Sequence, residues 1–326
     1  MPLGKKFGFI ATILLLFLAA SCGSSSASSS SSLGAVNVLY AGSLVTMMEK
    51  SVGPSFTKAT NYTYLGEGKG SVALANEIKG KLRRPDIFIS ADPTVNSLLT
   101  GQANGNYVSW YIPFASTSLV LGYNPNSSFA AQFQAAQSGA VPWWQVLEQP
   151  GLRLGRTDPA IDPKGVYTIL AFELAQKYYN QPNLSAVILG SAENTAQIFP
   201  EEELVSRLQS GQLDAGIFYS TEVTALKIPY ITLPDQINFG NPVDASFYSQ
   251  VSYTSSSGKI TQGAPIEYTI TIPSTSQDPQ GAIAFVRYFL GAAGSALLKQ
   301  YGLTLLPLSI VGSGAPAEIV QLAQGS

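Results

Sequence analysis

Two serines stand where an apolar strand pattern gives way to a helical one. The apolar run 36–40 ends just before Ser43, and Ser71 follows Gly68-Lys69-Gly70 at the start of a second helical pattern. Unpaired N–H groups and the positive end of the dipole at such helix starts favour a bound anion, and each hydroxyl can donate one more hydrogen bond. N-capping alone would explain each serine separately. Together, at the carboxyl ends of strands in an open α/β sheet, the two serines indicate an anion-binding edge.

A third helix start lies in the middle of the chain, in the stretch GRTDPAIDPKGVYT. Asp162 precedes Pro163 there, which is the pattern of an N-cap residue followed by proline at the first helical position. The first turn of this helix, 164–167, could approach an anion from the side opposite to the two serines. Tyr219, at the end of a predicted strand, could add a phenolic donor. A cap, a turn or a core aromatic is the alternative interpretation of these residues.

The composition excludes several kinds of chemistry. The 326 residues include no histidine and one cysteine, which excludes Ser-His-Asp and Cys-His catalysis and zinc sites built on His or Cys. A net charge of −2, with no basic run longer than a pair, argues against nucleic acid as a partner. An extracellular hydrolase or lyase using Asp158 and Asp162 is a weaker alternative, because both carboxylates precede prolines in turns. We expect the acidic run 201–203 to cap a helix on a solvated face.

Apolar strand-like runs alternate with helical patterns from Val36 onward. This alternation is typical of an α/β protein with mainly parallel sheets. The predicted strands are 36–40, 86–90, 118–123, 213–219, 230–233 and 266–272. We expect helices to begin near Ser71 and after the Asp-Pro pairs at 92–93, 162–163 and 278–279.

Two segments, 111–125 and 264–276, have the pattern of strands that cross between domains. The stretch between them is about 150 residues long, the size of one domain. We therefore predict two α/β lobes joined by two crossing strands, with a ligand cleft at the hinge. Lobe 1 comprises residues 36–116 and 271–326, and lobe 2 comprises residues 117–270.

The N-terminal residues 1–21 have the pattern of a signal peptide, because Lys5 and Lys6 precede the apolar stretch 7–20. Residues 18–22, LAASC, resemble a bacterial lipobox, in which the cysteine is lipidated and becomes the new N-terminus. We therefore predict Cys22 as a lipid anchor, with residues 22–35 forming the anchor and a serine-rich tether. An ordinary signal peptide with an incidental cysteine is the alternative. Both interpretations predict an exported protein, periplasmic or on the cell surface.

Six segments together resemble the periplasmic molybdate/tungstate-binding proteins of ABC transporters, particularly the tungstate-binding branch. In chain order they are VLYAGSL, GEGKGSV, DIFISAD, GRTDPAIDPKG, LDAGIFYSTEV and ITLPDQINFG, and the similarity extends from about Val36 to Leu308. The resemblance implies the type II periplasmic binding-protein fold and a receptor, not an enzyme, that needs no cofactor. It would capture molybdate or tungstate and deliver the oxyanion to the permease subunits of an importer, and it would work as a monomer. Sulfate, phosphate, a ferric ion or a small sugar are alternative cargoes for the same fold.

The resemblance also implies a set of site residues. The residues expected to contact the oxyanion are Ser43, Ser71, Asp162, Gly165, Val166 and Tyr219. Those expected to border the site are Ser90, Ala91, Ser116, Lys164 and Glu222. Lys164 replaces a cysteine of the family pattern and could add positive charge near a dianion. Phe218 stands where the tungstate branch usually has a glutamate, and because a phenyl ring cannot be a ligand, we predict that no six-coordinate metal centre forms here.

Overall fold

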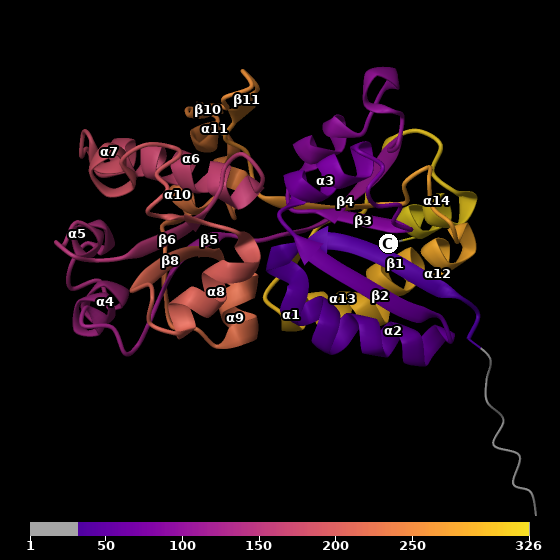
Figure 1. Ribbon diagram of the computed structural model, residues 1–326, viewed down its shortest axis with the longest axis horizontal. Coiled ribbons are helices and arrows are strands. Elements are labelled where there is room, and N and C mark those ends of the chain that lie inside the picture. The colour runs from indigo at the N-terminus through magenta and orange to yellow at the C-terminus, as the bar shows by residue number, and fades with distance from the viewer. Residues whose placement is uncertain (1–31, 326) are drawn as a thin grey trace, which may run out of the picture. The chain divides into compact units, whose positions relative to one another are not determined.

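The computed structural model describes residues 32–325, so Cys22, the predicted signal peptide and most of the predicted tether lie outside the described residues. Lobe 1 is built around a mixed sheet (Figure 1). Its strands are β1 (Ala35–Ala41), β2 (Thr63–Lys69), β3 (Ile87–Ser90), β4 (Trp110–Ser116), β12 (Glu267–Thr271), β13 (Thr304–Leu305) and β14 (Val311–Gly312). They are arranged in the order β13-β4-β12-β3-β1-β2, with β14 also paired to β4.

Helices from both ends of the chain pack on this sheet. They are α1 (Val45–Met47), α2 (Gly53–Thr60), α3 (Ser71–Lys79), α12 (Pro279–Leu290), α13 (Ala292–Gln300) and α14 (Ala317–Gln324). Short 3-10 turns occur at η1 (Gly42–Leu44), η3 (Pro93–Leu98) and η4 (Gln102–Asn104), and a π-helical segment, η2 (Met48–Val52), joins α1 to α2.

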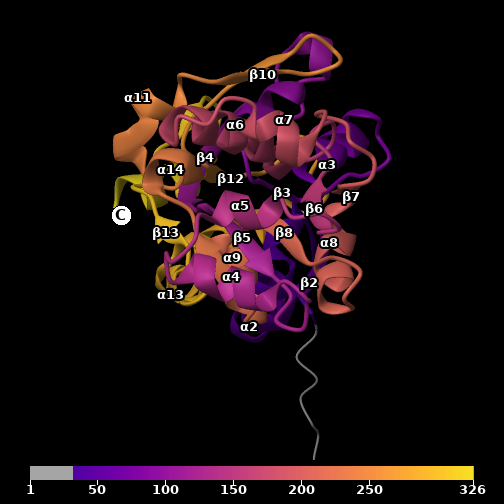
Figure 2. The ribbon, with the colours of Figure 1, turned by 90° about the vertical axis from the view of Figure 1, so that its left-hand side faces the viewer.

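Lobe 2 has a five-stranded sheet in the order β7-β6-β8-β5-β9, the strands being β5 (Leu119–Tyr123), β6 (Leu154–Thr157), β7 (Ile198–Phe199), β8 (Ala215–Tyr219) and β9 (Tyr230–Thr232). Its helices are α4 (Ala130–Gln137), α5 (Trp143–Leu147), α6 (Pro163–Tyr178), α7 (Leu184–Leu189), α8 (Glu201–Gln209), α9 (Ser220–Leu226), α10 (Asp235–Asn238), η5 (Pro242–Asp244) and α11 (Ala245–Tyr248). A hairpin of β10 (Ser252–Thr254) and β11 (Ile260–Gln262) follows. In the views of Figures 1 and 2, α6 covers one face of this sheet and α8 and α9 cover the other.

All six predicted strands are present, but the sheets are mixed, so the prediction of mainly parallel sheets is wrong. β1 runs parallel to β2 and β3, and β6 runs parallel to β7 and β8. Every antiparallel pair within the two sheets described for residues 32–325 involves β4, β5 or β12. These three strands flank the crossings between lobes, and the chain reverses its direction there.

Thr117 and Ser118 separate β4 of the first sheet from β5 of the second, and the domain boundary after Ser116 stays a prediction. The second boundary, predicted between 270 and 271, falls inside β12. All of β12 pairs with β3 and β4 of lobe 1. We therefore place the return crossing before Glu267, a few residues earlier than the sequence pattern indicates.

Each of the three Asp-Pro pairs marks a helix start, and the aspartate caps the helix that follows. Asp162 and Asp278 cap α6 and α12 by accepting from the amides of Lys164 and Gly281. Asp92 caps in the same way, but the helix after it, η3, is a 3-10 helix. The helix after Ser43 begins as the 3-10 turn η1 and passes through α1 and the π segment η2 into α2.

Asp86 ties the two chain segments of lobe 1 together. Its Oδ2 accepts from the backbone amide of Asn37 at 2.9 Å, and its Oδ1 accepts from Ser276 Oγ and the amides of Gln277 and Asp278 at 2.8–2.9 Å. The carboxylate is completely buried, and these bonds satisfy both of its oxygens. They hold the start of β3 against β1 and against the segment that leads into α12.

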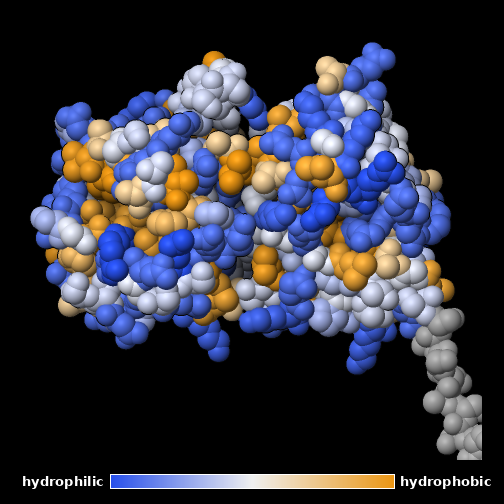
Figure 3. Space-filling view, in the orientation of Figure 1, coloured by the Kyte–Doolittle hydropathy of each residue, from blue (hydrophilic) through white to orange (hydrophobic). Residues whose placement is uncertain are grey.

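Within residues 32–325, no single helix is long and apolar enough to cross a bilayer; only α12 and α13 taken together, which meet at 56°, reach that length and composition. On the face drawn in Figure 3, apolar side chains lie in separate groups over both lobes and form no continuous band.

Candidate functional site

Ser43 and Ser71 lie at the same edge of the first sheet. β1 and β2 are parallel neighbours with Ala41 paired to Lys69, so each serine stands two residues beyond a paired position. Neighbouring strands are about 4.8 Å apart, which places the two helix starts side by side. Both serines are buried, with 6% and 1% of their surface exposed. The structure thus brings these two predicted contacts together at the carboxyl ends of parallel strands.

Each serine makes one hydrogen bond that leaves a donor available. Ser71 Oγ accepts from the amide of Ala91 at 3.1 Å, so its own hydroxyl hydrogen remains to be donated. Ser43 Oγ lies 2.8 Å from Tyr268 Oη, and whichever of the two donates, the other keeps its hydrogen. Tyr268 was not among the predicted site residues. It lies in the predicted strand 266–272, but nothing local in the sequence indicates its contact with Ser43.

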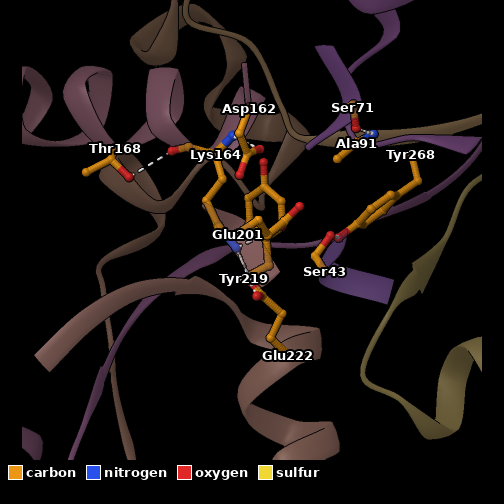
Figure 4. Close-up of polar contacts among 10 residues, drawn as sticks. All are labelled: Ser43, Ser71, Ala91, Asp162, Lys164, Thr168, Glu201, Tyr219, Glu222 and Tyr268. Atoms are coloured by element: carbon orange, nitrogen blue, oxygen red, sulfur yellow. Dashed lines mark hydrogen bonds and ion pairs between the residues drawn. The ribbon is translucent and has the colours of Figure 1, made fainter. Parts of the chain in front are cut away.

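Asp162 approaches from lobe 2, at the first turn of α6 (Figure 4). Its Oδ1 accepts from the amide of Lys164 at 3.0 Å, whereas its buried Oδ2 makes no hydrogen bond within 3.5 Å. The Thr157 hydroxyl, which is also buried and unpaired, is a neighbour of this carboxyl and acts to lower its pKa. Burial, and then the charge of Glu201, raise the pKa of Asp162 to about 8 against the opposing effect of Lys164. The carboxyl is therefore mostly protonated at neutral pH and presents an O–H group.

Tyr219 is the second group from lobe 2 with an unsatisfied polar atom. The side chain is completely buried at the end of β8, and its hydroxyl has no hydrogen-bond partner. Burial and the nearby Asp162 raise the pKa of Tyr219 well above its ordinary value, so the phenol keeps its proton. An unpaired buried hydroxyl costs free energy unless something binds to it. Tyr219 Oη is therefore a buried donor without a partner, and its contact with a ligand stays a prediction.

Lys164 is the centre of a buried ionic cluster, which we define as Lys164, Glu201 and Glu222. The Lys164 Nζ lies 2.9 Å from Glu201 Oε1 and 2.9 Å from both carboxylate oxygens of Glu222. Burial alone would lower the pKa of Lys164, but the charges of Glu201 and Glu222 outweigh burial and raise it. The lysine therefore stays charged, and two carboxylates surround its single positive charge.

Both carboxylate oxygens of Glu222 make hydrogen bonds within the protein. Besides its two contacts with Lys164, its Oε2 accepts from the amide of Tyr219 at 2.7 Å, at the start of α9. Burial raises its pKa, and Lys164 opposes that rise. Glu222 thus holds Tyr219 and Lys164 in place, and its position at the border of an oxyanion site stays a prediction.

Glu201 is the residue that sequence analysis most clearly missed. The prediction of a solvated acidic face is wrong for it, because only 6% of its surface is exposed. Its Oε1 bonds Lys164, while its buried Oε2 has no partner and lies against lobe 1, where a Cβ on Gly42 would stand 2.4 Å away. A run of three glutamates at a helix start gives no signal that the first of them turns inward.

The two lobes meet directly around these groups. The amide of Ala73, in the first turn of α3, donates to the carbonyl of Ile161 at 3.2 Å. A Cβ on Gly70 would stand 2.7 Å from the same carbonyl oxygen, so glycine is required there for this approach. A groove of about 250 Å³ opens beside Gly42 and Ser43, with Glu201 and Glu222 in its opposite wall. It is a route from solvent to the edge of the site.

Gly165 and Val166, two further predicted contact residues, lie in the first turn of α6. Gly165 donates its amide to the Asp162 carbonyl at 3.1 Å, and a Cβ on it would stand 2.6 Å from the Thr157 carbonyl oxygen, so packing alone explains this glycine. Val166 is partly buried in the same turn. A ligand contact of either backbone stays a prediction.

Ser90 and Ser116 support the site from lobe 1. The Ser90 hydroxyl donates to the carbonyl of Asp92 at 2.9 Å and accepts from its amide, so it shapes the loop after β3. Ser116 is buried at the end of β4, where Glu267 and Thr304 pair on either side of it. Ala91 acts through its amide, which holds the hydroxyl of Ser71.

Phe218 and Tyr219 point to opposite faces of β8, as successive strand residues do. Phe218 packs among Leu204, Val223 and their neighbours on the side of α8 and α9. Its ring also lies 5.9 Å from the Lys164 Nζ. The absence of a six-coordinate centre stays a prediction.

The alternative with Asp158 as an acid or base has a structural explanation instead. Asp158 accepts from the amide of Ala160 at 2.8 Å within its own turn. No group of three His, Cys, Asp or Glu side chains suited to a metal ion occurs between residues 32 and 325.

Comparison with known proteins gives similar sequences over most of the chain. A putative ABC transporter molybdenum-binding protein of Haloferax volcanii is 32% identical over 270 residues, which are 83% of this chain and 81% of the relative. A molybdate/tungstate-binding protein of Thermococcus kodakarensis is 27% identical over 278 residues, 79% of this chain and 77% of the relative.

Solved structures share the fold at lower identity. The periplasmic molybdate-binding protein of Azotobacter vinelandii matches with a TM-score of 0.58 and 17% identity, over 83% of this chain and 99% of that one. The sulfate-binding protein SubI of Mycobacterium tuberculosis matches with a TM-score of 0.54 and 14% identity, over 89% of this chain and 91% of that one. These neighbours confirm the two-lobed type II periplasmic binding-protein fold.

The family is shown by a match that covers most of the chain. The model for bacterial extracellular solute-binding proteins matches residues 36–304, which include every predicted contact residue in both lobes. Proteins of this family are exported and bind solutes, and the hydrolase or lyase alternative is therefore not supported. The chain belongs to the family of bacterial extracellular solute-binding proteins.

Proposed function

We propose that this protein captures a tetrahedral oxyanion, molybdate or tungstate, between its lobes and delivers it to an ABC importer. The observation that carries the proposal is the arrangement of donors from facing lobes. Hydroxyl hydrogens of Ser71 and of the Ser43–Tyr268 pair are available on one side, and the unpartnered hydroxyl of Tyr219 stands on the other. Similarity to the molybdenum-binding protein of Haloferax and the molybdate/tungstate-binding protein of Thermococcus supports the same class of cargo.

Neutral donors suit this task. The oxyanion must give up its hydration when the lobes close, and hydroxyl and amide groups can replace those hydrogen bonds without bringing a counter-ion. The first turns of α3 and α6 add the positive ends of two helix dipoles. Closure of the lobes is then driven by contacts that the ligand makes only in the closed state.

The two serines test the proposal most directly. We expect the double variant Ser43→Ala, Ser71→Ala to lose molybdate and tungstate binding by at least about a hundredfold, because two hydroxyl donors to a buried anion disappear at roughly 1.5–3 kcal/mol each. Calorimetric titration of the soluble part of the chain with molybdate, tungstate, sulfate and phosphate in parallel measures the affinity and ranks the anions.

A matched control is Ser138→Ala, which removes an exposed serine hydroxyl in lobe 2 that bonds only the Ala135 carbonyl. It should bind as the unchanged protein does. Full affinity in the double serine variant would eliminate this site, and failure of the unchanged protein to bind any of the four anions would eliminate the proposed function.

The same proposal includes a lipid anchor at Cys22, docking of the monomer on permease subunits, and a serine-rich tether between the membrane and the lobes. The pattern LAASC and the serine-rich stretch after it support the anchor. Cells fed a labelled fatty acid should label the full-length protein and not the Cys22→Ser variant, which should leave the membrane fraction. Equal labelling of the two would remove the anchor while leaving the oxyanion site untouched.

A further inference from the structure

Two carboxyl groups in the site have an oxygen without any partner. They are Asp162 Oδ2 and Glu201 Oε2, both buried. Among residues 32–325, Lys164 is the one cation that acts on Asp162, and Glu201 and Glu222 already surround it. If all three carboxyls were ionised, the site would carry a net negative charge before any ligand arrived.

A fully ionised oxyanion offers only acceptor oxygens, and an ionised carboxylate also offers only acceptors. Asp162 faces the edge that holds Ser43 and Ser71, so a bound dianion would lie against Asp162 Oδ2 (Figure 4). Two sets of acceptors cannot share a buried contact unless a hydrogen lies between them. Unless the carboxylate coordinates the metal atom of the oxyanion directly, the dianion must therefore be accompanied by a proton on this carboxyl.

On the basis of the proposed function, we infer that Asp162 binds the oxyanion as a protonated carboxyl that donates a hydrogen bond from Oδ2, and that Glu201 is the residue that keeps it protonated. Binding is then coupled to a proton, which comes from solvent and stays on Asp162. This makes Asp162 a ligand-binding donor and Glu201 a positioning residue of the site.

The surroundings of Asp162 agree with this coupling. The titratable and charged groups that lie around it are Lys164 on its own helix, Glu201 on α8, Glu222 on α9, Tyr219 on β8 and Tyr268 on β12. Burial and Glu201 raise its pKa to about 8, and the charge of a neighbouring dianion raises it further.

The sign of the pH dependence follows from linkage. Below about pH 8 the proton is already present on Asp162, so affinity changes little with pH. Above that value the proton must be taken up together with the anion, and affinity falls about tenfold for each pH unit. A site of neutral hydroxyls and amides alone would show no such fall, because none of those donors titrates in this range.

The experiment is a calorimetric titration with molybdate and with tungstate between about pH 6.5 and about pH 9.5, each in two buffers of different ionisation enthalpy. The difference between buffers counts the protons bound. We expect uptake to approach one proton per oxyanion at the alkaline end. Affinity independent of pH, with no proton uptake, would overturn the inference while leaving the proposed function intact.

Three isosteric variants sharpen the test. Asp162→Asn keeps the acceptor for the Lys164 amide and supplies a permanent donor, so it should bind the oxyanion with an affinity that no longer falls above pH 8. Glu201→Gln removes a charge that holds the proton on Asp162, so the fall should begin at lower pH. Glu202→Gln, next to it on α8 but exposed, is the control and should behave as the unchanged protein does.

Each other outcome counts against the inference. An Asp162→Asn protein that is folded but binds at no pH, or that keeps the alkaline fall, would contradict a donor role for Asp162. If that variant does not fold, Glu201→Gln decides the matter, and an unchanged pH profile in it would contradict the role of Glu201. Failure of the unchanged protein to bind at every pH would refute the proposed function.

Discussion

Lys164 joins three helices of lobe 2 through one buried ammonium group. It stands in α6 and bonds Glu201 of α8 and Glu222 of α9. The Lys164 side chain is completely buried and that of Glu201 nearly so. If one partner of the cluster is lost, little water can reach the remaining charges to solvate them. A change at this residue should therefore act mainly on stability.

We expect Lys164→Met to lower the free energy of unfolding by about 3–5 kcal/mol, because two carboxylates lose their buried partner. Urea unfolding of the ligand-free protein measures this. Lys177→Met, at the exposed end of the same helix, should change it by less than about 0.5 kcal/mol. Combining Lys164→Met with Glu201→Gln and Glu222→Gln should recover part of the loss. A loss below about 1 kcal/mol in the single variant would show that the cluster is not a stabilising unit.

At the scale of elements, the start of α3 is the clearest contact between the lobes. Gly70 precedes this helix, and its lack of a side chain lets the Ile161 carbonyl approach the Ala73 amide. The backbone at Gly70 has φ −52°, which alanine adopts without strain. A side chain there would obstruct only the approach of lobe 2.

We therefore expect Gly70→Ala to weaken oxyanion binding by at least about tenfold while changing the free energy of unfolding by less than about 1 kcal/mol. Calorimetry gives the affinity, and small-angle scattering should show that the ligand no longer makes the variant more compact. Gly80→Ala, at the other end of α3, is the matched control, since the atom nearest to its Cβ belongs to its own helix. Normal binding by Gly70→Ala would mean that the lobes close in another way.

Local chemistry made much of this predictable. Asp-Pro pairs predicted the starts of α6 and α12, and the apolar run before Ser43 predicted β1. The two serines were expected together at the carboxyl ends of strands, but β2, the strand before Ser71, was not among the predicted strands. The site residues that depend on distant partners were not predictable. Tyr268 reaches Ser43 across 225 positions of sequence, and Glu201 turns inward toward a lysine 37 positions away. A pattern of neighbours carries no information on such pairs. The antiparallel pairs in the two sheets were not predicted for the same reason, because strand direction depends on how the chain crosses between lobes.

At the scale of the whole molecule, the order of strands in lobe 1 constrains how the protein can assemble. β12 lies between β3 and β4, although about 150 residues of lobe 2 separate it from them along the chain. The sheet of lobe 1 therefore lacks a central strand, β12, until residue 271 has emerged. A chain delivered from its N-terminus through an export channel cannot complete this lobe on the way, and it must close loops of high contact order afterwards. The same interleaving that forms the hinge thus leaves the sheet of lobe 1 incomplete until β12 has emerged, whereas all five strands of the lobe 2 sheet precede residue 233.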